Sequence, residues 1–261
     1  YKAGLHCISM QFDTLDPVVH RIHRNNEYIE EKKAAIRNCS NAGTRIIVTI
    51  TVTNYNINGI GEVVRYVRGF SPKAWLVSIL PLYKTGHVSI GGDSLGICRE
   101  RIVKAICSAG IIKDLSPASF RPLPFFAPAH MCVHPDCGAI AVVLTGPSDD
   151  LLLDKAVDMD KLYRLLGVYR RHPGKYAWAL FLLTISIFRA SNKRFLIRLI
   201  RSMYGFMTGK GRYGVLILSV ENFQVCDFQD EQRMRRCATA IRTLDGCNHD
   251  GCFIYRKQIW K

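Results

Sequence analysis

The chain has 261 residues, of which 48% are hydrophobic, and its formal net charge at pH 7 is +15. This composition can bury a substantial core and excludes an intrinsically disordered chain. The excess of Lys and Arg over Asp and Glu predicts an acidic partner, with nucleic acid and anionic lipid headgroups as the two candidates.

The first half of the sequence alternates the patterns of strands and helices. The predicted strands cover residues 5–12, 45–53 and 75–82. One helix is predicted to begin at Asp16-Pro17, a favourable N-cap and N1 pair. Three further helices are predicted at residues 28–41, 62–68 and 95–110. Repeated β–α units predict an α/β fold with a parallel sheet or a barrel sector and right-handed crossovers.

Ligands of parallel α/β folds bind at the carboxyl ends of the strands. These ends carry Gln11 and Asp13, then residues 51–54 including Thr51, then residues 81–84. An amide and a carboxylate on one side of an extended segment could hold a ribose or an amino-acid group; alternatively, Asp13 only caps the loop that follows. No glycine-rich phosphate fingerprint follows a strand, so we expect neither a dinucleotide site nor a P-loop.

Cysteines supply candidate metal ligands later in the chain. Cys132 and Cys137 lie in the segment CVHPDCG, and Cys237 precedes Cys252 by 15 positions. Grouped thiolates predict zinc or an iron-sulfur cluster, but their spacing does not name the metal. The alternative is that the cysteines are reduced and fill small apolar sites. We predict that role for three others: Cys39, Cys98 and Cys107.

The chain has ten cysteines, but secreted disulfide frameworks belong to much smaller domains. No signal-peptide pattern is present at its start, so we expect a reducing cytoplasm. The sequence begins at Tyr1, without Met and close to a predicted strand, and we therefore expect an upstream part to be missing.

Basic residues are concentrated between positions 164 and 212, around the apolar run 176–188, which is too short to span a bilayer. Residues 195–204 have apolar side chains at helical spacing with arginines between them, as in an interfacial amphipathic helix. The alternative is a core helix with a solvated basic face. Peripheral contact with an anionic membrane is expected, whereas nucleic acid is not, because no known nucleic-acid-binding motif is found.

Several short motifs occur in a specific order. They are 9–16 (SMQFDTLD), 32–43 (KKAAIRNCSNAG), 48–52 (VTITV), 120–124 (FRPLP), 134–138 (HPDCG), 157–160 (VDMD), Arg236-Cys237, Asp245-Gly246 and Cys252. In this order they resemble the later part of radical SAM proteins of the tetraether lipid synthase type. The resemblance covers residues 1 to about 165 and 220 to 256.

The resemblance implies a partial (β/α)6 radical SAM-type barrel, containing its later strands only, followed by a cysteine-rich and helical C-terminal region. It implies S-adenosylmethionine and [4Fe-4S] clusters as cofactors for radical chemistry on an unactivated carbon of a small molecule or a lipid. Gln11, Asp13 and Thr51 would line the S-adenosylmethionine side of the barrel. An auxiliary cluster would be held by four cysteines: Cys132, Cys137, Cys237 and Cys252.

The sequence departs from the family pattern at two points. Phe125 follows the FRPLP motif where relatives carry a cysteine, so Cys132 serves as a ligand only if the loop is shifted. The Cys-x3-Cys-x2-Cys loop of the family is absent from this chain. Cys226 and Cys247 are further thiols in the same region, and Cys247 could replace Cys252 as a ligand.

The predicted organisation has four segments. They are a partial barrel (1–115), a cluster-binding region (116–165), a basic and apolar helical segment (166–219) and a C-terminal cysteine-rich segment (220–261). The alternative function is a non-catalytic zinc-binding module whose basic face binds an acidic partner. The identity of the metal separates the two, because an iron-sulfur cluster is coloured and reducible whereas zinc is neither.

Overall fold

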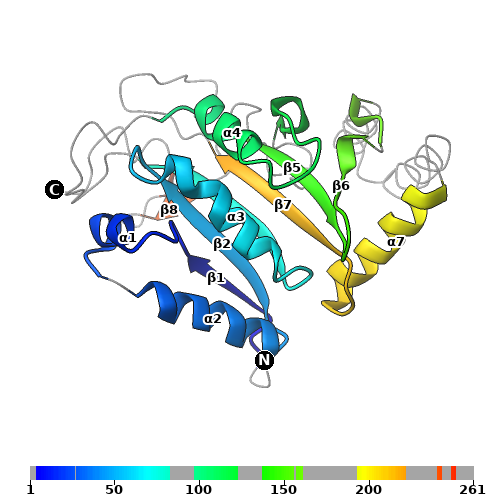
Figure 1. The fold of residues 1–261 in the computed structure, drawn as a ribbon, viewed down its shortest axis with the longest axis horizontal. Helices are drawn as coiled ribbons and strands as arrows, with labels where there is room; N and C mark the ends of the chain where they lie inside the picture. Colours follow the sequence, from blue (N-terminus) through cyan, green and yellow to red (C-terminus); the bar gives the residue numbers. More distant parts are fainter. Residues whose placement is uncertain are drawn as a thin grey trace.

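The computed structural model describes residues 4–26, 28–82, 97–122, 137–155, 157–160, 193–221, 240–242 and 248–250. Within them a seven-stranded sheet has the order β1-β2-β3-β7-β5-β4, with β6 paired to β5 (Figure 1). Its strands are β1 (Cys7–Gln11), β2 (Arg45–Val52), β3 (Ala74–Pro81), β4 (Arg121–Pro122), β5 (Gly138–Thr145), β6 (Leu151–Leu152) and β7 (Gly214–Glu221). A separate hairpin is formed by β8 (Ala240–Arg242) and β9 (Asn248–Asp250).

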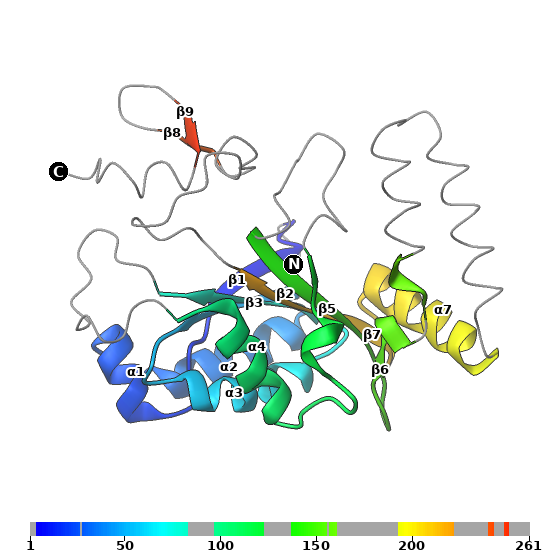
Figure 2. The same ribbon diagram turned by 90° about the horizontal axis from the view of Figure 1, so that it is seen from above.

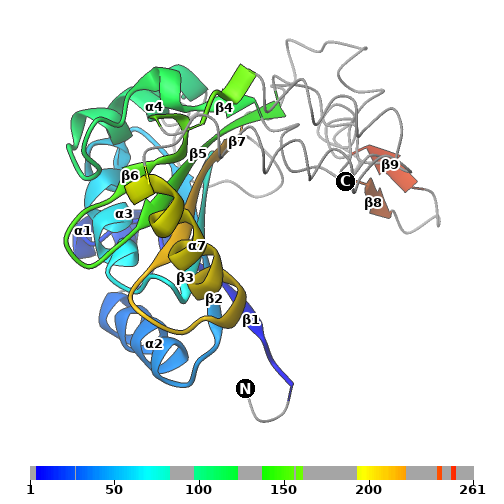
Figure 3. The same cartoon turned by 90° about the vertical axis from the view of Figure 1, so that its right-hand side faces the viewer.

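The described α-helices are α1 (Pro17–Arg24), α2 (Ile29–Asn41), α3 (Ile60–Arg68), α4 (Arg99–Ser108) and α7 (Lys193–Thr208). Short 3-10 turns are η1 (Ile57–Gly59), η3 (Pro117–Ser119) and η6 (Leu153–Lys155). Helices α1 to α4 lie on one side of the sheet, and the β8–β9 hairpin lies on the other (Figures 2 and 3). None of the helices in the described ranges is long and apolar enough to cross a membrane.

The α/β prediction is confirmed, and so are its first three strands. β1, β2, β3 and β7 are parallel neighbours, as expected for β–α units. β7 inserts between β3 and β5, however, and β5 runs antiparallel to β7 and to its other partners, β4 and β6. The sheet is therefore mixed, and its strand order does not confirm a (β/α)6 barrel.

The core between the helices and the sheet follows from the alternation of side chains along β2. Ile46, Val48, Ile50 and Val52 are all fully buried on the helix side. Full burial of such a side chain contributes about 1.5–3 kcal/mol. The other residues of β2 are only partly buried and face away from α1 to α4.

The start of α1 agrees with its predicted cap. The Asp16 carboxylate accepts hydrogen bonds from the amides of Val18 and Val19, at 2.8 and 3.4 Å, and Pro17 occupies the first turn. α4 starts later than predicted, at Arg99. Its N-cap residue is the exposed Cys98, so the prediction that Cys98 packs in the core was wrong. This residue precedes the helix and therefore lies outside its apolar period.

The predicted core role is supported for Cys39 and Cys107, which are partly buried and pack against the main core. Burial raises the pKa of the Cys107 thiol, and a raised pKa keeps a thiol protonated and unreactive.

A second, smaller core lies on the opposite side of the sheet from α1 to α4. There, α7 packs its Phe195 and Leu199 against Ile140, Val142 and Val215 of β5 and β7. The predicted amphipathic helix at residues 195–204 is confirmed as part of α7. This helix covers one end of the sheet, close to β5 and β7.

Candidate functional site

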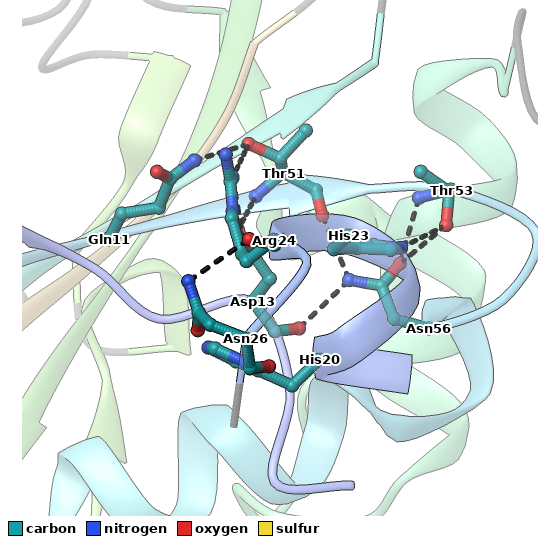
Figure 4. Close-up of polar contacts among 9 residues, drawn as sticks. All are labelled: Gln11, Asp13, His20, His23, Arg24, Asn26, Thr51, Thr53 and Asn56. Atoms are coloured by element: carbon teal, nitrogen blue, oxygen red, sulfur yellow. Dashed lines mark hydrogen bonds and ion pairs between the residues drawn. The ribbon is translucent and has the colours of Figure 1, made fainter. Parts of the chain in front are cut away.

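The three residues predicted to line a ligand site meet where β1 and β2 end. The Gln11 side-chain amide donates to the Thr51 hydroxyl at 3.0 Å, and the Thr51 backbone N–H donates to the Asp13 carboxylate at 2.7 Å (Figure 4). The contacts follow from the parallel pairing of β1 with β2, which brings the two carboxyl ends to the same edge of the sheet.

Arg24, at the end of α1, completes this cluster. Its Nε donates to the other Asp13 oxygen at 2.8 Å, and a terminal nitrogen donates to the Thr51 hydroxyl at 3.4 Å. The Asp13 side chain is fully buried, whereas the Arg24 side chain is 30% exposed. Asp13 therefore positions Arg24 and Thr51 from the buried side of the cluster. Arg24, Gln11 and Thr51 are the groups that a ligand can reach.

Asn56 joins the turns that follow the two strands. Its side-chain nitrogen donates to the backbone carbonyls of Asp13 and Thr51, at 2.8 Å each, and its side-chain oxygen accepts from the Thr53 backbone N–H at 2.8 Å. Asn56 is buried, so these bonds form away from water, where leaving a polar group unpaired is costly. They hold the edge of the sheet in one conformation.

Basic side chains lie around Asp13, but burial disfavours the charged form of two of them. His23 lies 2.7 Å from the Thr53 hydroxyl, and burial lowers its pKa more than the nearby Asp13 carboxylate raises it. Burial likewise lowers the pKa of Lys32 more than the nearby Asp13 carboxylate raises it. Three basic side chains, those of Arg24, His23 and Lys32, therefore interact with the Asp13 carboxylate. The partly exposed Arg24 favours a ligand with an anionic group, and Gln11 and Thr51 favour one with several hydroxyls.

A line of polar side chains continues from this edge across the sheet. It consists of Gln11, Thr49, Ser78 and Ser219, and each of them is the register partner of the next, from β1 through β2 and β3 to β7. We call these residues the polar row. They lie on the side of the sheet away from α1 to α4, because they alternate with the buried core residues. Strands buried on both faces are normally apolar on both, so the partly exposed Gln11, Thr49 and Ser78 indicate a polar surface. Ser219 is buried at the end of this row.

Glu221, the last residue of β7, adds a carboxyl group beside the polar row. It accepts a hydrogen bond from the Ser78 hydroxyl at 2.7 Å. Burial raises its pKa, and the bond from Ser78 opposes this only in part. Glu221 can accept a hydrogen bond from an amine or hydroxyl of a ligand on this face.

Of the four predicted cluster ligands, only Cys137 lies within the described residues. Its side chain is partly buried. The next residue, Gly138, pairs with Glu221, so Cys137 lies at the same edge of the sheet as the polar cluster. Cys132, Cys237 and Cys252 lie outside the described residues, as do the alternative thiols Cys226 and Cys247. Across the described ranges there is no group of three or more potential metal ligands.

Several members of the site were not predicted from the sequence, among them Arg24, Asn56, Ser78 and Glu221. Ser78, Ser219 and Glu221 are the polar residues of otherwise apolar strands, and this was a usable signal. Arg24 and Asn56 resemble ordinary surface residues in the sequence. Their roles depend on contacts with residues 11 to 43 positions away in the chain.

Fold and site together define an α/β protein with a mostly parallel sheet and a polar, basic cluster at the carboxyl edge of β1 and β2. No known family model matches the chain, and no curated protein is significantly similar to it.

Proposed function

We propose that the chain is part of a radical SAM enzyme that uses S-adenosylmethionine and [4Fe-4S] clusters for chemistry on an unactivated carbon of a small molecule or lipid. The supporting observation is the convergence at one sheet edge. Gln11 and Asp13 are both hydrogen-bonded to Thr51 there, and Cys137 immediately precedes β5 at the same edge. These residues come from sequence segments up to 126 positions apart.

The donor groups at this edge fit parts of S-adenosylmethionine. The Gln11 amide and the hydroxyls of Thr49 and Thr51 are partly exposed and can bind ribose hydroxyls. Arg24 can pair with the carboxylate of the methionine part. The Glu221 carboxyl can accept from its ammonium group or from the substrate. Asp13, fully buried, fits a positioning role rather than direct contact.

Bound S-adenosylmethionine and a reduced cluster would supply a carbon radical able to take a hydrogen atom from an unactivated carbon. The described residues would hold and orient the ligand. The buried contacts of Asn56 and Asp13 keep Gln11 and Thr51 fixed before the ligand arrives, which reduces the entropy lost on binding. The free thiols of Cys7, Cys39, Cys98 and Cys107 fit a reducing cytoplasm, which we propose as the location.

The proposal is tested by titrating S-adenosylmethionine into the full chain in an isothermal calorimeter under anaerobic conditions. Gln11→Ala and Thr51→Val each remove one hydrogen-bonding group, and we expect each to weaken binding about 3- to 10-fold. Ser9→Ala is the matched control, since Ser9 is exposed on the same strand and face, two residues before Gln11. Absence of binding by the wild type, or equal effects of all three variants, would contradict the proposal.

A further inference from the structure

Helix α7 carries a continuous stripe of exposed apolar side chains. The exposed residues are Ile197, Ile200, Met203, Tyr204 and Met207, with Met207 the most exposed at 75%. Their spacing of three and four places them on one face over three turns of the helix. Monomeric proteins usually bury such stripes, and an exposed one marks a surface that binds something apolar.

The fold does not need this stripe for its own core. The packed side of α7 is formed by Phe195, Leu199 and Phe206, which contact β5, β7 and the ring of Trp75. The exposed stripe faces away from that contact. α7 therefore has two apolar faces, and only one of them is covered within the described part of the chain.

Basic residues border the stripe. Arg201, Lys210 and Arg212 line an open groove of about 520 Å³ together with Ile200, Tyr204 and Tyr213. Arg201 donates to the Tyr213 hydroxyl at 3.4 Å and lies over the Tyr213 ring. No acidic side chain of the described residues forms an ion pair with these three cations. From Lys193 to Tyr213 the sequence contains Lys and Arg but neither Asp nor Glu.

We propose that α7 and the groove beside it bind the surface of an anionic lipid bilayer. The apolar stripe would enter the boundary between headgroups and acyl chains, while Arg201, Lys210 and Arg212 would contact lipid phosphates. The charge pattern favours this occupant over the others. A nucleic acid would leave the exposed Ile200 and Met207 in water, and a second copy of α7 would bring two sets of like charges together.

The inference is independent of the radical SAM proposal, because it rests on residues of α7 and the following loop. It is tested by co-sedimentation of the full chain with vesicles of phosphatidylcholine alone or with one third phosphatidylglycerol. We expect binding to the anionic vesicles only, and weaker binding as salt increases. Replacing Arg201, Lys210 and Arg212 by Gln should reduce the partition coefficient about 100-fold, at about fivefold for each charge. The double variant Ile200→Ser, Met207→Ser should reduce it about tenfold or more.

Matched controls come from the other side of the sheet. Arg37→Gln, Lys104→Gln, Lys113→Gln removes the same charge, and Val18→Ser, Ile22→Ser removes two exposed apolar side chains of α1. Both control variants should bind anionic vesicles within about twofold of the wild type, because the changed side chains lie away from the proposed contact with the lipid surface.

Three results would overturn the proposal. The first is no binding of the wild type to anionic vesicles. The second is binding that the apolar variant retains in full, which would indicate a general polyanion site instead of a lipid surface. The third is a wild-type dimer, seen by light scattering, that the Ile200→Ser, Met207→Ser variant dissociates, because the stripe would then be the contact between two copies.

Discussion

Replacing Asp13 by Ala should lower the free energy of unfolding by about 2–5 kcal/mol. The change removes the acceptor of two groups. The Thr51 backbone N–H, 2.7 Å from the carboxylate, would be left without it, at a cost of about 1–3 kcal/mol. Arg24 would lose its ion pair, but its side chain is 30% exposed and can turn to water, so this part costs only about 1–2 kcal/mol.

Urea unfolding at pH 7, followed by circular dichroism, measures this loss. Asp150 provides the matched control, because it is 7% exposed and accepts from Arg68, whose side chain is also 30% exposed. Asp150→Ala should cost a similar free energy of unfolding but leave the affinity for S-adenosylmethionine unchanged, whereas Asp13→Ala should lower both. A loss of less than about 1 kcal/mol for Asp13→Ala would refute the assigned role of this carboxylate.

Gly61→Ala should destabilise the protein by about 1–3 kcal/mol in the same assay, because the new Cβ would lie 2.3 Å from that of Ala109. Gly59→Ala, where nothing lies within 4 Å, should be nearly neutral, and equal losses would argue against tight α3–α4 packing. The pKa of Glu221 is raised in the folded protein, so the stability it contributes is present at low pH and is lost as pH rises through that pKa. Because Gln does not titrate, the stability of Glu221→Gln relative to the wild type should increase as pH rises from 4 to 8. A difference in the free energy of unfolding that stays constant over this range would contradict the raised pKa. The pKa of His23 is lowered, so the unfolded state binds the proton first and the wild type should lose stability as pH falls below about 6.5. Between pH 7 and pH 5, His23→Gln should lose less of its free energy of unfolding than the wild type does. Urea unfolding at both pH values measures this difference.

The parts of the fold that local patterns determine were predictable from the sequence. The β-branched run of β2 and the Asp16-Pro17 cap of α1 specify their elements within a few residues. The meeting of Gln11 and Thr51 followed from the rule that parallel strands end at one edge. In the same way, the apolar period of residues 195–204 predicted a helix, although not which of its faces would stay exposed.

What the sequence did not indicate depends on long-range pairing. Nothing local in β7 predicts that it inserts between β3 and β5, so the mixed sheet and the approach of Glu221 to Ser78 were missed. Arg24 was missed because its partner, Asp13, belongs to the preceding strand end. The role of Cys98 was wrong because the helix was predicted to begin too early.

The most direct test of the cluster-bearing enzyme proposed here is the iron, sulfide and zinc content of the protein prepared without oxygen, together with its visible spectrum. The wild type would be compared with the double variant Cys137→Ala, Cys237→Ala. We predict about four iron and four sulfide per chain with broad visible absorption, all lost in the double variant. One zinc per chain without sulfide would contradict the radical SAM proposal and favour a zinc-binding module, and the absence of both metals would contradict any metal role for these cysteines.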